Sequence, residues 1–405
     1  MIHAKLVQPR IFPHNSARQP EQIDRAQDIA GDLTINQEKI YEIGREGKLG
    51  VRKSNPSLAY SMTQYEYGSM AFWYALANIE DPASDGLNNS IDLDDIKSTT
   101  FDISAYMTDD SNVFKGTMWF PKLRVNGFSL NIGNPDATVE RKFNLIGEDF
   151  KILDGKYFAY KSKISSVDGA EDISLDPPDP IEYAAGKFVF RVLRIRNGEV
   201  TEIPEGTGDN TYQYEPTGKD VYIQACLIGD LHKAYYAAET AYTTLWTNND
   251  VDSDSLLAES CEIYLKVGTG TRIYRLQSVG IDVSFERTDY REIGNIDVVQ
   301  RGVKSKTVTV KLDRFNEGYS LEDILASDTI YPYIDPRNFS DTIQLQVKIF
   351  ADNTHTTFKM GYLIKALSPT TLGTSQAIED YNKVTNSLES DNLKISSDES
   401  EIVFE

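Results

Sequence analysis

The stretch RAQDIAGDLTINQEKIYEIG, residues 25–44, decides the fold because a related stretch, RLQSVGIDVSFERTDYREIG, follows 250 positions later at residues 275–294. Six of the twenty positions are identical, whereas unrelated segments would share about one or two. The identities pair Arg25, Gln27, Asp32, Glu42, Ile43 and Gly44 with Arg275, Gln277, Asp282, Glu292, Ile293 and Gly294. The chain therefore contains an internal repeat.

The similarity continues in the same order beyond these stretches. SLAYSM from Ser57 aligns with TVTVKL from Thr307, and both alternate apolar and polar residues as a half-buried strand does. A short helix is predicted next in each copy: MAFWYALA follows Ser69, and Ser320 with Asp323 forms a capping-box pattern before ILA. Each copy therefore adds a helix to its strands.

A polar loop in the first copy, EDPASDGLNNSIDLDD, accounts for about eight extra residues. After it, FDISAYM from Phe101 aligns with IQLQVKI from Ile343. KGTMWFPKLRV then aligns with TFKMGYLIKAL, which places Met118 opposite Met360, and NLIGEDFKI aligns with SLESDNLKI. Collinear order over more than about a hundred residues predicts a duplicated unit.

The predicted fold is mainly β, with two tandem antiparallel β-barrel or sandwich domains at 1–154 and 271–405, each with a short flanking helix. Residues 155–270 form an intervening α+β segment, either an inserted subdomain or an elaborated start of the second copy. It begins with a linker, SSVDGAEDISLDPPDP, and contains a hairpin signal at Asn197-Gly198. A strand VYIQACLI, a helix HKAYYAAETAYTTLW and a final strand CEIYLKV complete it.

The charge and cysteine content exclude several functional classes. A net charge of −21 over 405 residues disfavours a protein that grips nucleic-acid phosphates. Cys226 and Cys261 are too few for a disulfide framework or a cysteine-rich zinc site, and we expect two buried reduced thiols. No apolar run is long enough for a membrane span, and the first residues lack the apolar core of a secretory signal, so we expect folding in a cytoplasm.

No constellation of residues predicts catalysis. His3, His14, His232 and His355 are scattered, and neither a nucleophile elbow nor a P-loop is present. GTGTR at Gly268 indicates a turn. DVDSDSLLAES from Asp250 imitates half of an EF-hand loop but lacks its glycine and its final glutamate, which predicts a solvated acidic loop. We therefore predict no enzyme, no catalytic residue, no cofactor and no metal.

Three phrases carry a family resemblance: YEIGREGKLGVRKSNPSLAYSM, TVERKFNLIGEDFKIL and VGIDVSFERTDYREIG. They resemble the tail tube (major tail) proteins of long-tailed bacteriophages, in which a strand ending in Y-E-(I/L)-G-R is followed by a long loop and a strand near a proline. Tyr41 to Arg45 and Pro56 match this pattern, while the second copy departs from it at Asn295 and Lys306. The resemblance covers about 25–152 and 275–395.

This resemblance implies a virion structural protein that forms stacked rings around a channel for DNA ejection, assembled in the host cytoplasm. A duplicated unit implies a homotrimer that imitates a hexameric ring. Acidic residues lining the lumen would let DNA slide without specific binding; alternatively, the acidity keeps the free subunit soluble. The long loops after Gly44 and Gly294 are expected to reach the next ring.

The sequence is compatible with two other functions. One is a different ring component, such as a distal tail hub, a tail terminator or a secretion-system tube. The other is a carbohydrate-binding receptor adhesin, which would require exposed tryptophans. Of Trp73, Trp119 and Trp246, two lie within apolar runs, which favours burial.

Overall fold

A computed structural model gives the fold of the chain. It describes residues 5–14, 20–34, 37–41, 48–53, 57–79, 90–111, 113–134, 136–147, 149–175, 188–215, 220–238, 256–267, 269–272, 276–290, 300–315, 343–375 and 383–404, and the structural statements below concern these residues. The fold is mainly antiparallel β with a few short helices, as predicted.

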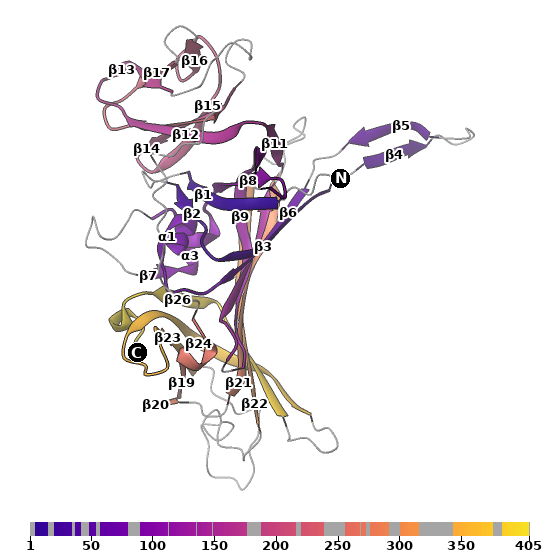
Figure 1. Ribbon diagram of the computed structural model, residues 1–405, viewed down its shortest axis with the longest axis vertical. Coiled ribbons are helices and arrows are strands. Elements are labelled where there is room, and N and C mark those ends of the chain that lie inside the picture. Colours follow the sequence, from indigo (N-terminus) through magenta and orange to yellow (C-terminus); the bar gives the residue numbers. More distant parts are fainter. Residues whose placement is uncertain are drawn as a thin grey trace.

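Eight strands form one wide antiparallel surface, seen nearly edge-on in Figure 1. Their hydrogen-bonded order is β3–β6–β10–β9–β21–β22–β25–β24. The strands are β3 (Ala26–Thr34), β6 (Ser57–Tyr65), β10 (Glu140–Gly147), β9 (Phe114–Ile132), β21 (Leu276–Tyr290), β22 (Gln300–Phe315), β25 (Lys383–Ser390) and β24 (Phe358–Ser375). We call this surface the large sheet.

A second layer covers one side of the large sheet. Its first part joins β1 (Lys5–Pro13), β8 (Phe101–Thr108), the start of β9 and β11 (Lys151–Asp154), with β2 (Glu21–Gln22) against β1. Its second part joins β19 (Cys261–Val267), β23 (Ile343–Phe350), the start of β24 and β26 (Asn392–Ser396), with β20 (Thr269–Arg272) against β19. The long strands β9 and β24 therefore run through both layers.

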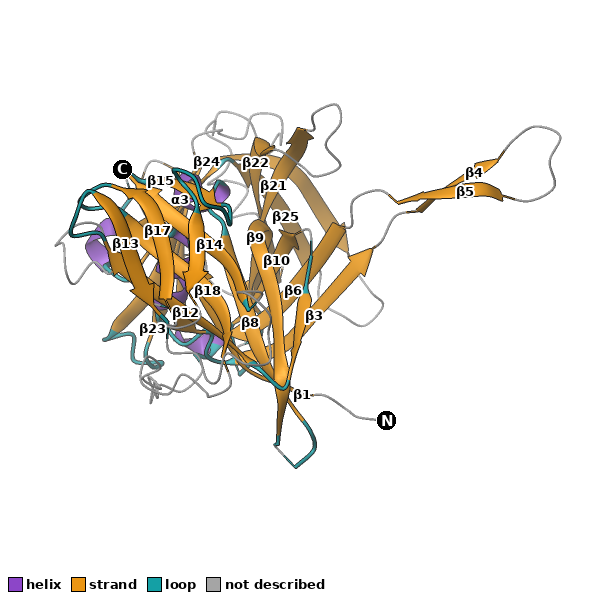
Figure 2. Cartoon of the chain, turned by 90° about the horizontal axis from the view of Figure 1, so that it is seen from above, coloured by secondary structure: helices purple, strands orange, loops and turns teal. Residues whose placement is uncertain are grey.

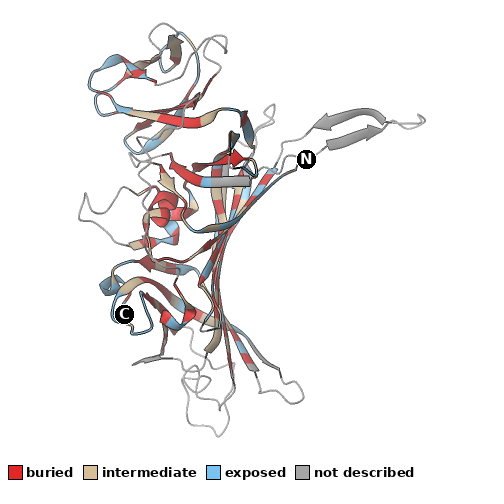
Figure 3. Ribbon diagram, viewed as in Figure 1, coloured by how far each residue is buried: buried red, intermediate tan, exposed pale blue. Residues whose placement is uncertain are grey.

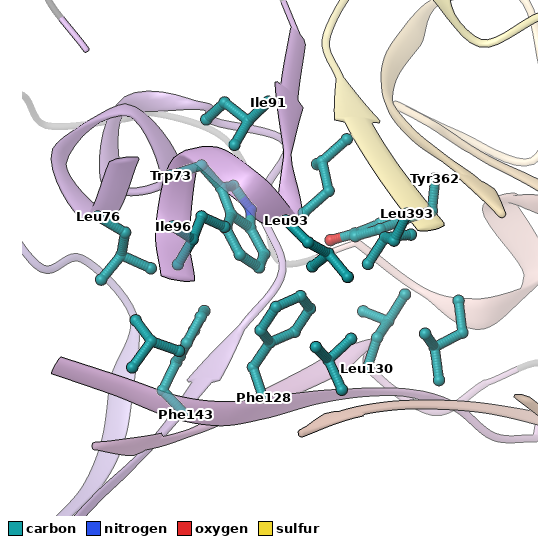
Figure 4. Packing of buried hydrophobic residues seen from close by; sticks show 14 of the residues in the cluster. Trp73, Leu76, Ile91, Leu93, Ile96, Phe128, Leu130, Phe143, Tyr362 and Leu393 are labelled. Carbon is teal, nitrogen blue, oxygen red and sulfur yellow. The ribbon is translucent and has the colours of Figure 1, made fainter. Parts of the chain in front are cut away.

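We call β1 to β11 the first half of the body (residues 5–154) and β19 to β26 the second half (residues 261–396). In the first half, α1 (Ala71–Ala77) and α3 (Leu93–Lys97) lie on the core side of the large sheet, and β7 (Ser90–Asp92) extends the second layer by pairing with β26. One hydrophobic core runs through both halves. In Figure 4, Trp73, Ile91, Leu93 and Ile96 lie beside Tyr362 and Leu393 of the second half.

Strands β12 to β18, residues 157–238, form a separate two-sheet sandwich that we call the insert, at the top of Figure 1. One sheet contains β12 (Tyr157–Ile164), β18 (Leu231–Ala238), β14 (Val189–Arg196) and β15 (Glu199–Ile203). The other contains β13 (Gly169–Ser174), β17 (Asp220–Cys226) and β16 (Tyr212–Glu215). The insert encloses its own hydrophobic core, which includes Val192, Ile223 and Tyr236.

The two halves of the large sheet share their irregularities. The register slips by one residue at Asn126 between β9 and β10, and at Thr370 between β24 and β25. Lys122 lies at the bulge where β9 pairs with β8, and Ala366 lies at the bulge where β24 pairs with β23. Both residues have φ of 53°. These positions are related by a constant shift of 244 residues, whereas β3 with β21 and β6 with β22 keep the shift of 250.

Several local predictions are confirmed. The helix after Ser69 is α1, and Asn197-Gly198 forms the turn of the β14–β15 hairpin with both residues at positive φ. FDISAYM, VYIQACLI and CEIYLKV contribute strands β8, β17 and β19. The capping-box segment at Ser320 lies outside the described residues.

Four predictions are wrong. EDPASDGLNNSIDLDD, expected to be a loop throughout, ends in strand β7 and the first residues of α3, because Ile91 and Leu93 join the core. HKAYYAA, expected to begin a helix, is strand β18, which is buried on both faces between β12 and β14 and so lacks the alternation of a half-exposed strand. The described part of the intervening segment, expected to be α+β, has no α-helix, and its expected linker contains β13. Tyr362, not Met360, occupies the position of Met118, because Met118 faces Ala105 as Tyr362 faces Val347.

Candidate assembly interface

The two halves of the large sheet meet at β9 and β21. Six residue pairs join these strands, from Ile132 opposite Val279 to Gly127 opposite Ser284. Gly127 permits the close approach, because a Cβ there would lie 2.4 Å from the Val283 carbonyl oxygen. We call this contact the β9–β21 junction. It connects the last strand of one four-strand set to the first strand of the next.

The large sheet ends in two open edges, seen from above in Figure 2. In the described part of the chain, β3 pairs with β6 alone, and residues 368–375 of β24 pair with β25 alone. Ile29 and Leu33 of β3 are half-buried, whereas their counterparts Val279 and Val283 in β21 are 1% and 4% exposed. The edge strand β3 therefore lacks the neighbour that β21 has.

A buried ion pair of the first half contacts the second half through a tyrosine hydroxyl. Glu66 lies 3.0 Å from Nη1 of Arg141, and its other carboxylate oxygen accepts hydrogen bonds from the backbone N–H groups of Tyr67 and Gly68. The Tyr362 hydroxyl of the second half donates to Glu66 at 3.3 Å. Although burial opposes the charge, Glu66 keeps the pKa of Arg141 raised. Removing Tyr362 or Arg141 would leave the Glu66 carboxylate buried with fewer partners, which is costly.

A second buried cluster attaches the insert to the first half through the carboxylate of Asp102. Asp102 accepts hydrogen bonds from Nε2 of His14 (2.7 Å), Nε1 of Trp119 (3.0 Å) and the backbone N–H of Lys122 (2.9 Å), and it pairs with Arg191 of the insert. Burial alone would raise the pKa of Asp102, but Arg191 and His14 outweigh it and hold this pKa well below its ordinary value.

Burial lowers the pKa of His14 to about 4, so its imidazole is neutral near pH 7. With Nε2 donating to Asp102, Nδ1 accepts from the Thr100 hydroxyl at 3.0 Å. Around this cluster Phe12, Phe158 and Tyr235 form an apolar contact between the first half and the insert. The insert is therefore packed onto the body rather than tethered to it.

The side of the large sheet opposite the core is polar, and we call it the open face. Figure 3 shows buried and exposed positions alternating along its strands. Its described charged side chains are Asp28, Asp32, Glu140, Asp282, Glu286, Asp313 and Glu389, with Arg124, Lys142, Lys304 and Lys311. Lys311 and Lys304 pair with Asp282 and Glu286, at 3.5 Å and 2.7 Å, so the face remains acidic.

A two-stranded hairpin projects from the open-edge side of the first half. It pairs β4 (Gln37–Tyr41) with β5 (Lys48–Lys53) and extends far from the body in Figures 1 and 2. The sequence predicts a long loop after Gly44, and β5 lies within it, while β4 lies near the end of the repeated stretch 25–44. The matching loop after Gly294 lies outside the described residues.

The residues considered for chemistry do not come together. His14 and His232 lie in separate buried clusters, and His355 lies near Glu262. Cys226 and Cys261 are free and buried, as predicted, and burial raises the pKa of Cys261 to about 12. No cluster of three metal-binding side chains occurs in the described part, and the acidic loop from Asp250 lies outside it.

Trp73 and Trp119 are buried, as their apolar surroundings predict, while Trp246 lies outside the described residues. None of the helices in the described ranges is both long and apolar enough to cross a membrane. No protein-family model and no curated protein matches this sequence.

The sequence predicts neither the two buried clusters nor the β9–β21 junction. A weak signal existed for one cluster, because Arg141 interrupts the core side of β10, which is otherwise apolar at Phe143 and Leu145. Asp102 lies on the opposite face of β8 from Phe101 and Ile103, so its burial beneath the insert left no such signal. The junction left no such signal, since strand pairing across the two halves depends on tertiary contacts.

Proposed function

We propose that this protein forms the stacked rings of a bacteriophage tail tube, with three chains in each ring. Each chain supplies two tail-tube-like units, the first half and the second half, and the second unit begins at β19. The observation that carries the proposal is the β9–β21 junction, because the chain's open edges, β24 and β3, are the repeat counterparts of β9 and β21. The resemblance of the repeated phrases to tail tube proteins supports the same assignment.

The junction within the chain supplies a register for a junction between chains. Ser129 lies opposite Asp282 in the β9–β21 junction. Applying the shifts of 244 and 250 places Gly373 of one chain opposite Asp32 of the next. A head-to-tail contact of this kind closes into a ring when its rotation permits, and three chains then provide six units.

The contact also satisfies the edges of the large sheet. An exposed edge strand offers unpaired N–H and C=O groups, which pair with any suitable strand. Pairing β24 with β3 of the next chain would use these groups and cover Ile29 and Leu33, which are half-buried at present. The eight-stranded surfaces of three chains would then join into one closed inner wall.

The open face suits the inside of such a wall. Ser, Thr, Gly and Asn residues lie between the acidic residues along the strands of the open face. A surface with more carboxylates than cations does not hold DNA phosphates, so DNA slides past it. The projecting β4–β5 hairpin is suited to contact the adjacent ring.

Disulfide trapping in assembled protein tests the ring. The variant Asp32→Cys with Gly373→Cys should give covalent trimers on a non-reducing gel after mild oxidation, and electron microscopy should show long hollow tubes. The matched control, Asp32→Cys with Leu372→Cys, is one residue out of register and should crosslink far less, because the two positions lie on opposite faces.

Other outcomes separate the alternatives. Single rings that do not polymerise would favour a distal hub or terminator. Tubes whose rings contain a number of chains other than three, or assembled tubes in which neither pair crosslinks, would refute the trimeric arrangement. A globular monomer at all concentrations would refute a tube protein altogether.

A further inference from the structure

Strands β26 and β11 occupy the same place in the two halves. β26 pairs with β24 so that Ile395 lies opposite Tyr362, and β11 pairs with β9 so that Ile152 lies opposite Met118. Met118 and Tyr362 are related by the shift of 244 residues. Ile152 and Ile395 are therefore counterparts.

The first half covers β26. β7 pairs with its outer edge, with Ile91 opposite Ile395. Leu93 of α3 joins the same core, and Ile395 is 1% exposed. This cover is a contact between the two halves, because β7 belongs to the first half and β26 to the second.

β11 lacks this cover. In the described part of the chain β11 pairs with β9 alone, so its outer edge carries no strand. Ile152 is 55% exposed, and Met118 and Phe150 beside the core are only partly buried. A large apolar side chain on an open strand edge is a site for strand addition by another chain.

We propose that the outer edge of β11, with Ile152 at its centre, binds the second half of a neighbouring copy of this chain. The occupant follows from the repeat: within the chain, the half that supplies β9 to the β9–β21 junction also covers β26 of the other half. Between chains, the half that supplies β24 must then cover β11 of the next copy. This inference rests on the proposed ring and gives it a second contact.

The two contacts lie in different layers of the molecule. The β24–β3 contact joins the large sheets, whereas the β11 edge lies in the second layer, next to β9 and beneath the insert. A ring held at both layers resists the rocking that a single line of strand pairing permits. In this arrangement Ile152, which is exposed in the single chain, would be buried in the contact with the neighbouring copy.

Photocrosslinking of assembled protein tests this contact. p-Benzoylphenylalanine replaces Ile152 in one sample and Ile228 in a control; Ile228 is 68% exposed at the turn between β17 and β18 of the insert. Mixing isotope-labelled and unlabelled chains distinguishes crosslinks between copies from those within one. We expect crosslinks from position 152 to residues 261–396 of another copy, and none from position 228 to that region.

A variant pair gives an independent measurement. Ile152→Asp should raise the protein concentration needed for tube formation by at least about tenfold, as loss of a buried contact residue does, while the thermal unfolding of the monomer stays unchanged. Ile228→Asp should alter neither. The unchanged monomer separates loss of the contact from misfolding.

The outcomes distinguish this inference from the ring itself. Wild-type rings with crosslinks from position 152 only within its own chain, or to the insert or hairpin of another copy, would overturn the β11 contact and leave the trimer standing. Normal assembly of Ile152→Asp would do the same. Absence of wild-type rings would overturn both proposals.

Discussion

β21 and β3 are the same strand of the repeat in two different surroundings. β21 has β9 on one side and β22 on the other, and its Val279 and Val283 are almost completely buried. β3 has β6 on one side only, and its Ile29 and Leu33 are half-buried. The difference shows that one junction is completed within the chain, and in the proposed ring the equivalent junction would form between chains. Folding and assembly should therefore be separable by mutation.

The largest effect on stability is expected when an aspartate replaces equivalent apolar residues of β21 and β3. Val283→Asp buries an unpaired carboxylate in the β9–β21 junction and should destabilise the monomer by about 3–5 kcal/mol. Leu33→Asp should lower the free energy of unfolding by about 1 kcal/mol but abolish tube formation, because the edge remains hydrated in the monomer. Urea unfolding and sedimentation of tubes measure the two quantities. Equal destabilisation by both variants would contradict the comparison.

Gly127 offers a milder way to open the junction within the chain. Gly127→Ala places a Cβ 2.4 Å from the Val283 carbonyl oxygen, and the strands must separate, so a loss of about 1–3 kcal/mol is expected. Gly280→Ala is the matched control, since its Cβ would have only Lys311 as a neighbour, at 3.9 Å. Urea unfolding should show a change within about 0.5 kcal/mol for the control. A similar loss in both variants would show that close approach at Gly127 does not matter.

Acid should weaken the first half more than the second, because, in the described part of the chain, the insert packs against the first half and His14 lies in that contact. The folded pKa of His14 is lowered to about 4, so the unfolded chain binds a proton below about pH 6.5 that the folded chain does not. Stability should therefore fall from about pH 6.5 to about 4, by about 1.4 kcal/mol per pH unit from this residue.

Urea unfolding between pH 7 and pH 5 measures this slope, which reports the number of protons taken up on unfolding. In His14→Gln that number should be smaller by about one. Burial also lowers the pKa of His232, within the insert, to about 4. Hydrogen exchange adds a spatial control, because the loss of protection that His14→Gln removes should be concentrated at the contact between the insert and the first half. An unchanged slope in His14→Gln would exclude His14 as the group responsible.

The smallest effect on stability is expected at the open face. Asp32→Lys with Asp282→Lys changes equivalent positions of β3 and β21, and each is exposed, so the free energy of unfolding should change by less than about 1 kcal/mol. Assembled tubes should nevertheless retain more duplex DNA in co-sedimentation at low salt, and the excess should disappear as salt rises. Equal DNA retention by variant and wild type would remove the open face as the inner surface.

Local patterns were sufficient for much of the fold. Alternation in SLAYSM and TVTVKL, the helix after Ser69 and the Asn197-Gly198 turn depend on neighbouring residues, and each was predicted from them. β18 was misassigned because burial on both faces removes the alternation that identifies a strand.

The candidate interface was less predictable. The repeat indicated that two similar units exist, but the β9–β21 register depends on the approach of Gly127 to Val283, which lie far apart in the sequence. The cluster around Asp102 likewise joins residues from β8, β9, β14 and the end of β1. Sequence periodicity describes a segment and its faces, and carries no information on which distant segment will face it.

The continuous core that links the two halves has a mechanical consequence. Pulling the halves apart would expose apolar surface and break the Glu66–Arg141–Tyr362 cluster, so the joint inside each chain is stiff. Joints between chains would depend on surfaces that are hydrated before assembly, and they would yield first under load. A tube of such rings would look sixfold in cross-section. Its deformability would be threefold, because the three joints between chains would be softer than the three joints within chains.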